Sequence, residues 1–112
     1  MASPSKAKGD RAERELAGLL SDLTGYDVRR ALGAGRKDDT GDAWGLPQTV
    51  IQVADWKDVI RAVREKPLEA EQQRMNANVG LAWTFVRLRG GVWRAVQTPE
   101  QMASTWREAV SW

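Results

Sequence analysis

The segment TGDAWGLPQTVIQVADWKD, residues 40–58, predicts two β-strands joined by a tight turn. Its second half is rich in β-branched residues, which favour a strand packed inside a sheet. Charged residues nevertheless lie at its ends, Asp42 in the first strand and Asp55 and Lys57 two positions apart in the second. A buried charge is costly unless it is paired or binds a metal. The segment therefore predicts a buried β-hairpin with a functional site.

The other elements follow from hydrophobic periodicity and from turn and capping residues. The apolar stripes that define the helices are Ala12, Leu16, Leu19, Leu20 and Leu23, then Leu68, Gln72, Met75 and Val79, then Met102, Trp106 and Val110. We predict a flexible basic tail (1–9), a helix (10–24), a strand (26–32), the hairpin, a helix (67–79), a second hairpin (81–97) and a helix from Pro99. The order αβββαββα predicts an α/β domain with one central sheet and helices against it.

Length and composition restrict the kind of protein. The chain has 112 residues, so we expect a single domain over residues 10–112. It has no cysteine and no histidine, so any metal must be held by oxygen ligands. The sequence shows neither a long apolar run nor a signal-peptide pattern, which predicts no membrane partner and a cytoplasmic location.

Basic residues are unevenly distributed, although the formal net charge is only +2. They gather in three groups: Lys6, Lys8, Arg11 and Arg14; Arg29, Arg30, Arg36 and Lys37; and Arg61, Arg64 and Lys66. Such groups in a tail and in predicted loops suit contact with backbone phosphates of a nucleic acid. An ordinary solvated surface is the alternative interpretation of the same charges.

The Asp-x-Lys pair carries chemistry of its own. Side chains alternate along a strand, so Asp55 and Lys57 point the same way. A carboxylate there can bind a divalent cation, and Asp42 in the partner strand offers a second. Mg²⁺ is commonly held by one or two carboxylates together with phosphate, and it promotes phosphodiester hydrolysis. The alternative is a simple ion pair at the end of a strand.

Three stretches, KGDRAEREL, YDVRRALGAGRKDDTGD and GDAWGLPQTVIQVADWK, resemble the archaeal Holliday-junction resolvases and their phage relatives, within the PD-(D/E)xK nuclease superfamily. The resemblance covers roughly residues 8–58. It implies a restriction-endonuclease-like fold with a central mixed sheet. It also implies a catalytic set of Glu13, Asp42, Asp55 and Lys57, in which the three acidic residues bind Mg²⁺, with Mn²⁺ able to substitute.

The resemblance further implies a homodimeric hydrolase that resolves branched DNA during recombination, in the cytoplasm of the host cell if a phage encodes it. Gln72 and Thr40 would be accessory to the site. We expect the tryptophans, including Trp44 and Trp56, in the core or a dimer interface. The residues expected to contact DNA are Lys8, Arg11, Arg14, Arg29, Arg30, Arg36 and Lys37.

The sequence departs from the family pattern at two places. Gly41 stands where the family usually has proline, and the loop of residues 32–41 offers only Thr40 where relatives often carry serine. An alternative register would place Gln52 and Ala54 in the site and imply an inactive enzyme. We prefer Asp55 and Lys57 because the interval from Asp42 to Asp55 matches the family hairpin. Two other functions stay open: a superfamily nuclease that cuts linear or damaged DNA, and a DNA-binding relative without activity.

Overall fold

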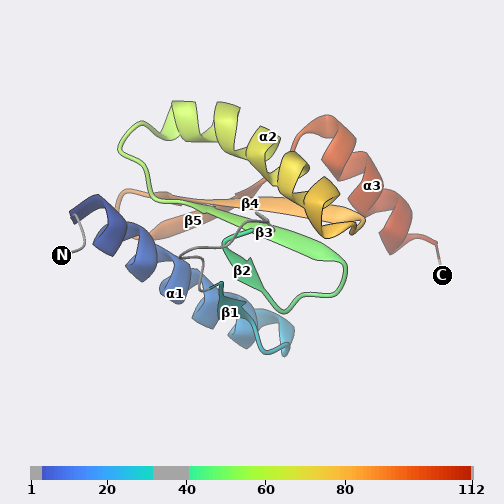
Figure 1. Cartoon of the computed structure of the whole chain (residues 1–112), viewed down its shortest axis with the longest axis horizontal. Coiled ribbons are helices and arrows are strands. Elements are labelled where there is room, and N and C mark those ends of the chain that lie inside the picture. Colours follow the sequence, from blue (N-terminus) through green and yellow to red (C-terminus); the bar gives the residue numbers. More distant parts are fainter. Residues whose placement is uncertain (1–3, 32–40, 112) are drawn as a thin grey trace.

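A computed structural model gives the structure of the protein over residues 4–31 and 41–111. The elements follow in the expected order αβββαββα (Figure 1). Their bounds are α1 (Pro4–Thr24), β1 (Arg29–Arg30), β2 (Ala43–Trp44), β3 (Thr49–Ala54), α2 (Val59–Ala77), β4 (Leu81–Leu88), β5 (Val92–Val96) and α3 (Pro99–Ala109). Within these residues, no helix has a stretch long and apolar enough to cross a membrane.

The five strands form one mixed sheet in the order β1-β2-β3-β4-β5. β3 pairs with β4 in parallel, and the other neighbours pair antiparallel. A parallel pair needs a crossover connection, and α2 provides it. The run from Val50 to Ala54, apolar except for Gln52, becomes the central strand, buried on both faces. The predicted α/β class with one central sheet is confirmed.

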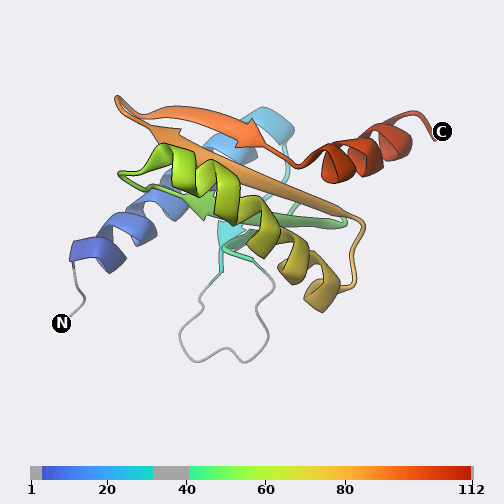
Figure 2. The same cartoon turned by 90° about the horizontal axis from the view of Figure 1, so that it is seen from above.

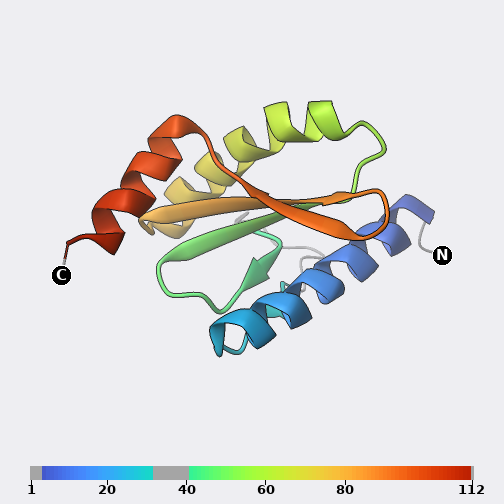
Figure 3. The same cartoon turned by 180° about the vertical axis from the view of Figure 1, so that it is seen from behind.

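Helices cover both faces of this sheet, with α1 on one face and α2 on the other (Figures 1 and 3). From β3, Ile51 and Val53 pack into the cluster that includes Leu16 of α1. Val50 and Ala54 belong to the clusters that hold the alanines of α2. Seen from above, α2 lies across the central strands (Figure 2). Successive residues of β3 therefore face different helices.

α1 is longer than the sequence pattern predicts. It begins at Pro4, so residues 4–9, which we expected in a flexible tail, are helical. Asp10 lies inside the helix instead of capping it, and its carboxylate pairs with Arg30 at 3.5 Å. The end of the helix agrees with the prediction, because Gly25 follows it with φ of +79°, a conformation that glycine adopts readily.

α2 is a single helix that starts eight residues before the predicted start at Pro67. Asp58 caps it, with its Oδ1 accepting a hydrogen bond from the Arg61 backbone N–H at 3.0 Å. The predicted apolar stripe is wrong: Leu68 and Met75 are 64% and 61% exposed. The face toward the sheet instead carries Ala62, Lys66, Ala70 and Gln73, whose alanines let the helix approach closely.

α3 has the predicted capping box. The Thr98 hydroxyl accepts from the Gln101 backbone N–H at 3.1 Å, and the Gln101 side chain accepts from the Thr98 N–H at 2.9 Å. Its predicted apolar side, which includes Trp106, is exposed instead of packed against the sheet. Gln101 is the buried residue, and its Nε2 donates to the Pro67 carbonyl of α2 at 3.0 Å. A polar anchor therefore attaches α3 to α2.

Candidate active site

Asp42 lies where β2 begins, at an edge of the central strand β3. Its backbone N–H donates to the Ile51 carbonyl, and its carbonyl accepts from the Ala31 N–H, both at 2.8 Å. Its side-chain Oδ2 accepts a hydrogen bond from the Val53 backbone N–H, also at 2.8 Å. A carboxylate thus takes the position of a strand partner at this point of β3. This anchoring fixes the Asp42 carboxylate at the edge of the sheet.

Glu13 of α1 carries a strongly perturbed carboxyl group beside it. Burial is the largest cause that raises the pKa of Glu13 to about 7, followed by the negative charges of Asp42 and Asp10. The positive charges of Arg30 and Lys66 act in the opposite direction. Two carboxylates that repel each other in a partly buried position are a common property of sites that bind a cation or transfer a proton.

Lys66 reaches the same place from the face of the sheet covered by α2. Its side chain is only 15% exposed, and its Nζ lies 2.9 Å from Glu69 Oε2. The ammonium also lies 5.0 Å from the centre of the Trp56 ring, within the range of a cation–π contact. Among the described residues near Glu13, Lys66 is thus a cation held in a defined position.

Gln52 of β3 joins Lys66 to Asp42. Its amide nitrogen donates to Asp42 Oδ2 at 3.1 Å, and its oxygen accepts from Lys66 Nζ at 3.0 Å. The reversed amide would reach Glu69 at 3.3 Å, but its oxygen would face the Asp42 carboxylate and its nitrogen the ammonium. The first orientation is therefore the favoured one. Gln52 is 3% exposed, so this chain of polar groups is buried.

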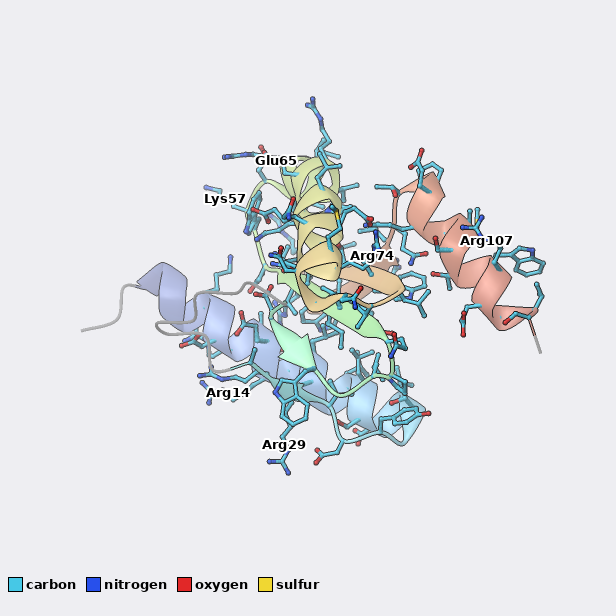
Figure 4. All side chains as sticks on the ribbon, turned by 45° about the vertical axis from the view of Figure 1, so that its right-hand side comes forward. Arg14, Arg29, Lys57, Glu65, Arg74 and Arg107 are labelled. Carbon is cyan, nitrogen blue, oxygen red and sulfur yellow. The ribbon has the colours of Figure 1, made fainter. Side chains whose placement is uncertain are left out.

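Asp55 and Lys57 lie beyond the end of β3, which stops at Ala54 and not near Lys57 as predicted. The Asp55 carboxylate is largely buried and pairs with Lys8 Nζ at 3.7 Å. Asp55 and Glu13 line one cavity of about 480 Å³, and the exposed Lys57 also borders it. Figure 4 shows the Lys57 side chain extending away from the body of the protein.

Three of the four expected catalytic residues therefore fall into two pairs that share Glu13. Glu13 is electrostatically coupled to Asp42 and shares the cavity with Asp55. Within residues 4–31 and 41–111, however, no three acidic residues lie close enough together to hold one metal ion. Asp42 instead contacts Gln52 and Val53, which lie three and two residues before the expected partner Asp55. The residue of the alternative register, Gln52, is the one that the structure places beside Asp42.

The expected DNA-contacting residues take several different positions. Lys8 and Arg30 form the ion pairs described above, and Arg29 pairs with Asp27 at 3.0 Å. Arg11 and Arg14 are exposed on α1 and form no ion pair with another residue of the described part. Arg14 and Arg29 lie on the side of the molecule formed by α1 and β1 (Figure 4). Three expected residues, Arg36, Lys37 and Thr40, are outside the described residues.

Sequence reasoning missed two polar residues on α2. The expected accessory residue, Gln72, is exposed and donates to Asn76 Oδ1 at 3.2 Å, whereas its neighbour Gln73 is buried beside Gln52. Lys66 was assigned to a surface group of basic residues. Positions 62, 66, 70 and 73 are three or four residues apart, so they share one face of a helix. The small and polar residues on that face are the pattern that could have identified Lys66 and Gln73. Trp44, expected in the core or an interface, is exposed in this chain.

Two carboxylates, from Glu13 and Asp42, lie close enough for Asp42 to raise the pKa of Glu13, but no third acidic residue of the described part joins them in one metal-binding group. Mg²⁺ is often held by one or two carboxylates with water and phosphate. Comparison with known proteins finds no matching family model, no matching curated protein and no matching solved structure.

Proposed function

We propose that the chain is a metal-dependent DNA endonuclease of the PD-(D/E)xK type that resolves Holliday junctions. The observation that carries the proposal is the carboxyl of Glu13, with a pKa of about 7, beside Asp42 and Lys66 at the edge of β3. An acidic pair and a cation at one point suit hydrolysis of a phosphodiester, whose transition state gains negative charge. The order αβββαββα, with acidic residues on α1 and before β2, is what the resemblance implies for this fold.

In this proposal Glu13 and Asp42 would hold Mg²⁺ or Mn²⁺, and Asp55 is a further acidic group on the Glu13 side. The bound ion would supply a charge that activates water and stabilises the reacting phosphate. Hydrolysis adds a water oxygen to phosphorus and breaks one bond from phosphorus to a sugar oxygen, and one proton of the water ends on that oxygen. Asp42 is suited to a fixed ligand because the Val53 amide orients its carboxylate.

Branched DNA as substrate rests on the resemblance and on the charges around the site. Arg11 and Arg14 extend from the helix that carries Glu13, where they are available to backbone phosphates. Two symmetric cuts across a junction require two sites, which a two-fold homodimer supplies. The exposed apolar side of α3, with Trp106, is a surface that a second copy would cover. Such an enzyme would act in the cytoplasm, of the host cell if a phage encodes it.

A second candidate is a DNA-binding relative that has lost cleavage. The absence, within the described residues, of three acidic residues able to share one ion favours it. Gln52 supplies a neutral amide at the level of Asp42, which weakens the site for a cation compared with a carboxylate. A nuclease that cuts linear or damaged DNA would keep the same residues and differ only in substrate.

The test is cleavage of a labelled four-way junction and of a linear duplex of the same sequence, with Mg²⁺ and with EDTA. Asp42→Asn is the decisive variant, because its amide oxygen still accepts from the Val53 N–H while the charge is lost. Asp55→Asn is the matched variant on the other side of Glu13. Symmetric cuts in the junction alone, abolished by EDTA and by Asp42→Asn, are the expected result.

Other outcomes select the alternatives. Cutting of both DNAs with the same dependence on Asp42 would identify a nuclease of different specificity. Junction binding without cleavage by the wild type, in Mg²⁺ and in Mn²⁺, would identify the inactive relative. Loss of cleavage in Asp55→Asn but not in Asp42→Asn would move the metal site to the cavity of Asp55.

A further inference from the structure

Polar side chains lie between α2 and the sheet at the position of Gln52. Lys66 and Gln73 point from the helix toward Gln52, and all three contact one another through the Gln52 amide. The neighbour of Gln52 in β4 is Thr84, which is fully buried, and its hydroxyl has no hydrogen-bond partner among the described residues. Burying such groups costs stability, and apolar residues would fill the same space at lower cost. A function is a reason to keep them.

The polar groups form a path that ends at the acidic pair. Lys66 donates to the Gln52 oxygen, and the nitrogen of the same amide donates to Asp42. The Gln52 amide thus joins the Lys66 ammonium to the Asp42 carboxylate through two hydrogen bonds, of 3.0 and 3.1 Å. Trp56, against which Lys66 packs, limits the directions that the lysine side chain can take.

We infer that Lys66, and not Lys57, supplies the positive charge at the reacting phosphate, with Gln52 as the residue that positions it. The inference rests on the proposed nuclease function. It moves the expected positively charged side chain from Lys57, beyond the end of β3, to Lys66 on α2. Lys66 would act by its charge, which is complementary to the negative charge gained by the phosphate in the transition state. It would transfer no proton.

A purely structural role for Lys66 is the competing explanation. Lys66 and Glu69 are three residues apart on α2, the spacing of ordinary helix-surface ion pairs. Such pairs form readily in water and do not require that the lysine be buried. Glu69 is about half exposed, whereas the Lys66 side chain is largely enclosed and faces the sheet. The burial follows from the contact with Gln52 and not from the pair with Glu69.

The experiment compares four variants: Lys66→Met, Lys66→Arg, Lys57→Met and Glu69→Gln. Junction affinity and the single-turnover cleavage rate in Mg²⁺ are measured for each. Thermal unfolding of each variant is also recorded, so that a loss of cleavage can be separated from a loss of folding. Glu69→Gln is the matched control, because it removes the ion pair on α2 and leaves the Lys66 charge in place.

We expect Lys66→Met to lower the cleavage rate by about 10²-fold with junction affinity within about 3-fold of wild type. Lys66→Arg, which keeps the charge, should recover part of the loss, and Lys57→Met and Glu69→Gln should cleave within about 3-fold of wild type. A purely structural role would not produce a recovery that follows the charge at position 66.

The inference is overturned if Lys57→Met loses cleavage while Lys66→Met keeps it, or if Glu69→Gln loses as much as Lys66→Met. If Lys66→Met does not fold, Lys66→Gln takes its place, and a folded Lys66→Gln that cleaves like wild type would also overturn the inference. A wild type that does not cleave would refute the proposed function itself, and the catalytic role of Lys66 with it.

Discussion

Replacing Glu13 by glutamine should stabilise the protein at pH 8 and leave its stability at pH 4 nearly unchanged. Glutamine keeps the size of the side chain and removes its charge. In the wild type, folding raises the pKa of Glu13 from 4.5 to about 7, because the carboxyl becomes partly buried near Asp42 and Asp10. Above pH 7 the folded protein must therefore hold an ionised carboxylate that the unfolded chain holds at lower cost.

The direction and size of the effect follow from proton linkage. Between pH 4.5 and about 7 the folded state keeps the Glu13 proton and the unfolded state loses it, so the free energy of unfolding falls as pH rises. Below pH 4.5 both states are protonated and the penalty disappears. At about 1.36 kcal/mol per pH unit the full difference corresponds to about 3.4 kcal/mol. Because Glu13 is only partly buried, screening by water should reduce the gain to about 1–2 kcal/mol.

Urea denaturation of wild type and Glu13→Gln at pH 4, 6 and 8 measures this difference. Glu15→Gln is the control on the same helix: hydrogen bonds from the Trp93 indole and the Arg87 guanidinium lower the pKa of Glu15, so its loss should destabilise the protein at pH 8. An equal gain for Glu13→Gln at pH 4 and pH 8, or no gain at pH 8, would refute the electrostatic account. Added Mg²⁺ should raise the stability of wild type at pH 8 more than that of Glu13→Gln.

Three further predictions concern the frame around the site. Gly45→Ala should lower the melting temperature by several degrees in a thermal scan, because Gly45 has a positive φ of +128° and an added Cβ would clash with the Asp27 carbonyl. An unchanged melting temperature would contradict the close approach of Gly45 to Asp27. Gln101→Ala should cost about 1–3 kcal/mol in urea denaturation, because it removes the polar anchor of α3; a neutral result would mean that α3 contributes little to stability. Arg11→Ala and Arg14→Ala should weaken junction binding and each reduce the salt dependence of log Kd by about one, as measured by fluorescence anisotropy between 50 and 200 mM salt; an unchanged slope would place the DNA elsewhere.

The sequence predicted the architecture well, because the strongest patterns are local ones. Alternation, capping residues and a long apolar run identify strands and helix ends without reference to the rest of the chain. Thr98 and Gln101, for example, formed the capping box that their spacing predicts. The burial of β3 followed from residues 50–54, which are apolar except for Gln52 and suit burial on both faces.

The faces of α2 and α3 were predicted less well, for a physical reason. Large apolar residues such as Leu68, Met75 and Trp106 suggested buried stripes, yet α2 lies so close to the sheet that its contact positions are small or polar. The alanines at two of these positions, Ala62 and Ala70, let the helix approach the sheet closely. Periodicity measures where apolar residues repeat, and not which face the sheet will cover.

The candidate site residues show the same limit. Glu13 and Asp42 were expected from the resemblance, and the structure couples them electrostatically. Lys66 was not identified, because it lies 24 residues after Asp42 on an element whose orientation is a tertiary property. The length of β3 also mattered: the strand ends at Ala54, so alternation no longer positions Lys57.

The hydrogen bond from the Val53 amide to the Asp42 side chain links the sheet directly to the site. Amides in the middle of a central strand usually exchange their protons with solvent only when the whole domain opens. The Val53 amide is held by one carboxylate instead of a neighbouring strand, so rotation of that single side chain is enough to release it. The hydrogen-exchange rate of the Val53 amide therefore reports how often the Asp42 carboxylate leaves this hydrogen bond. It can be measured in the native protein without DNA or metal.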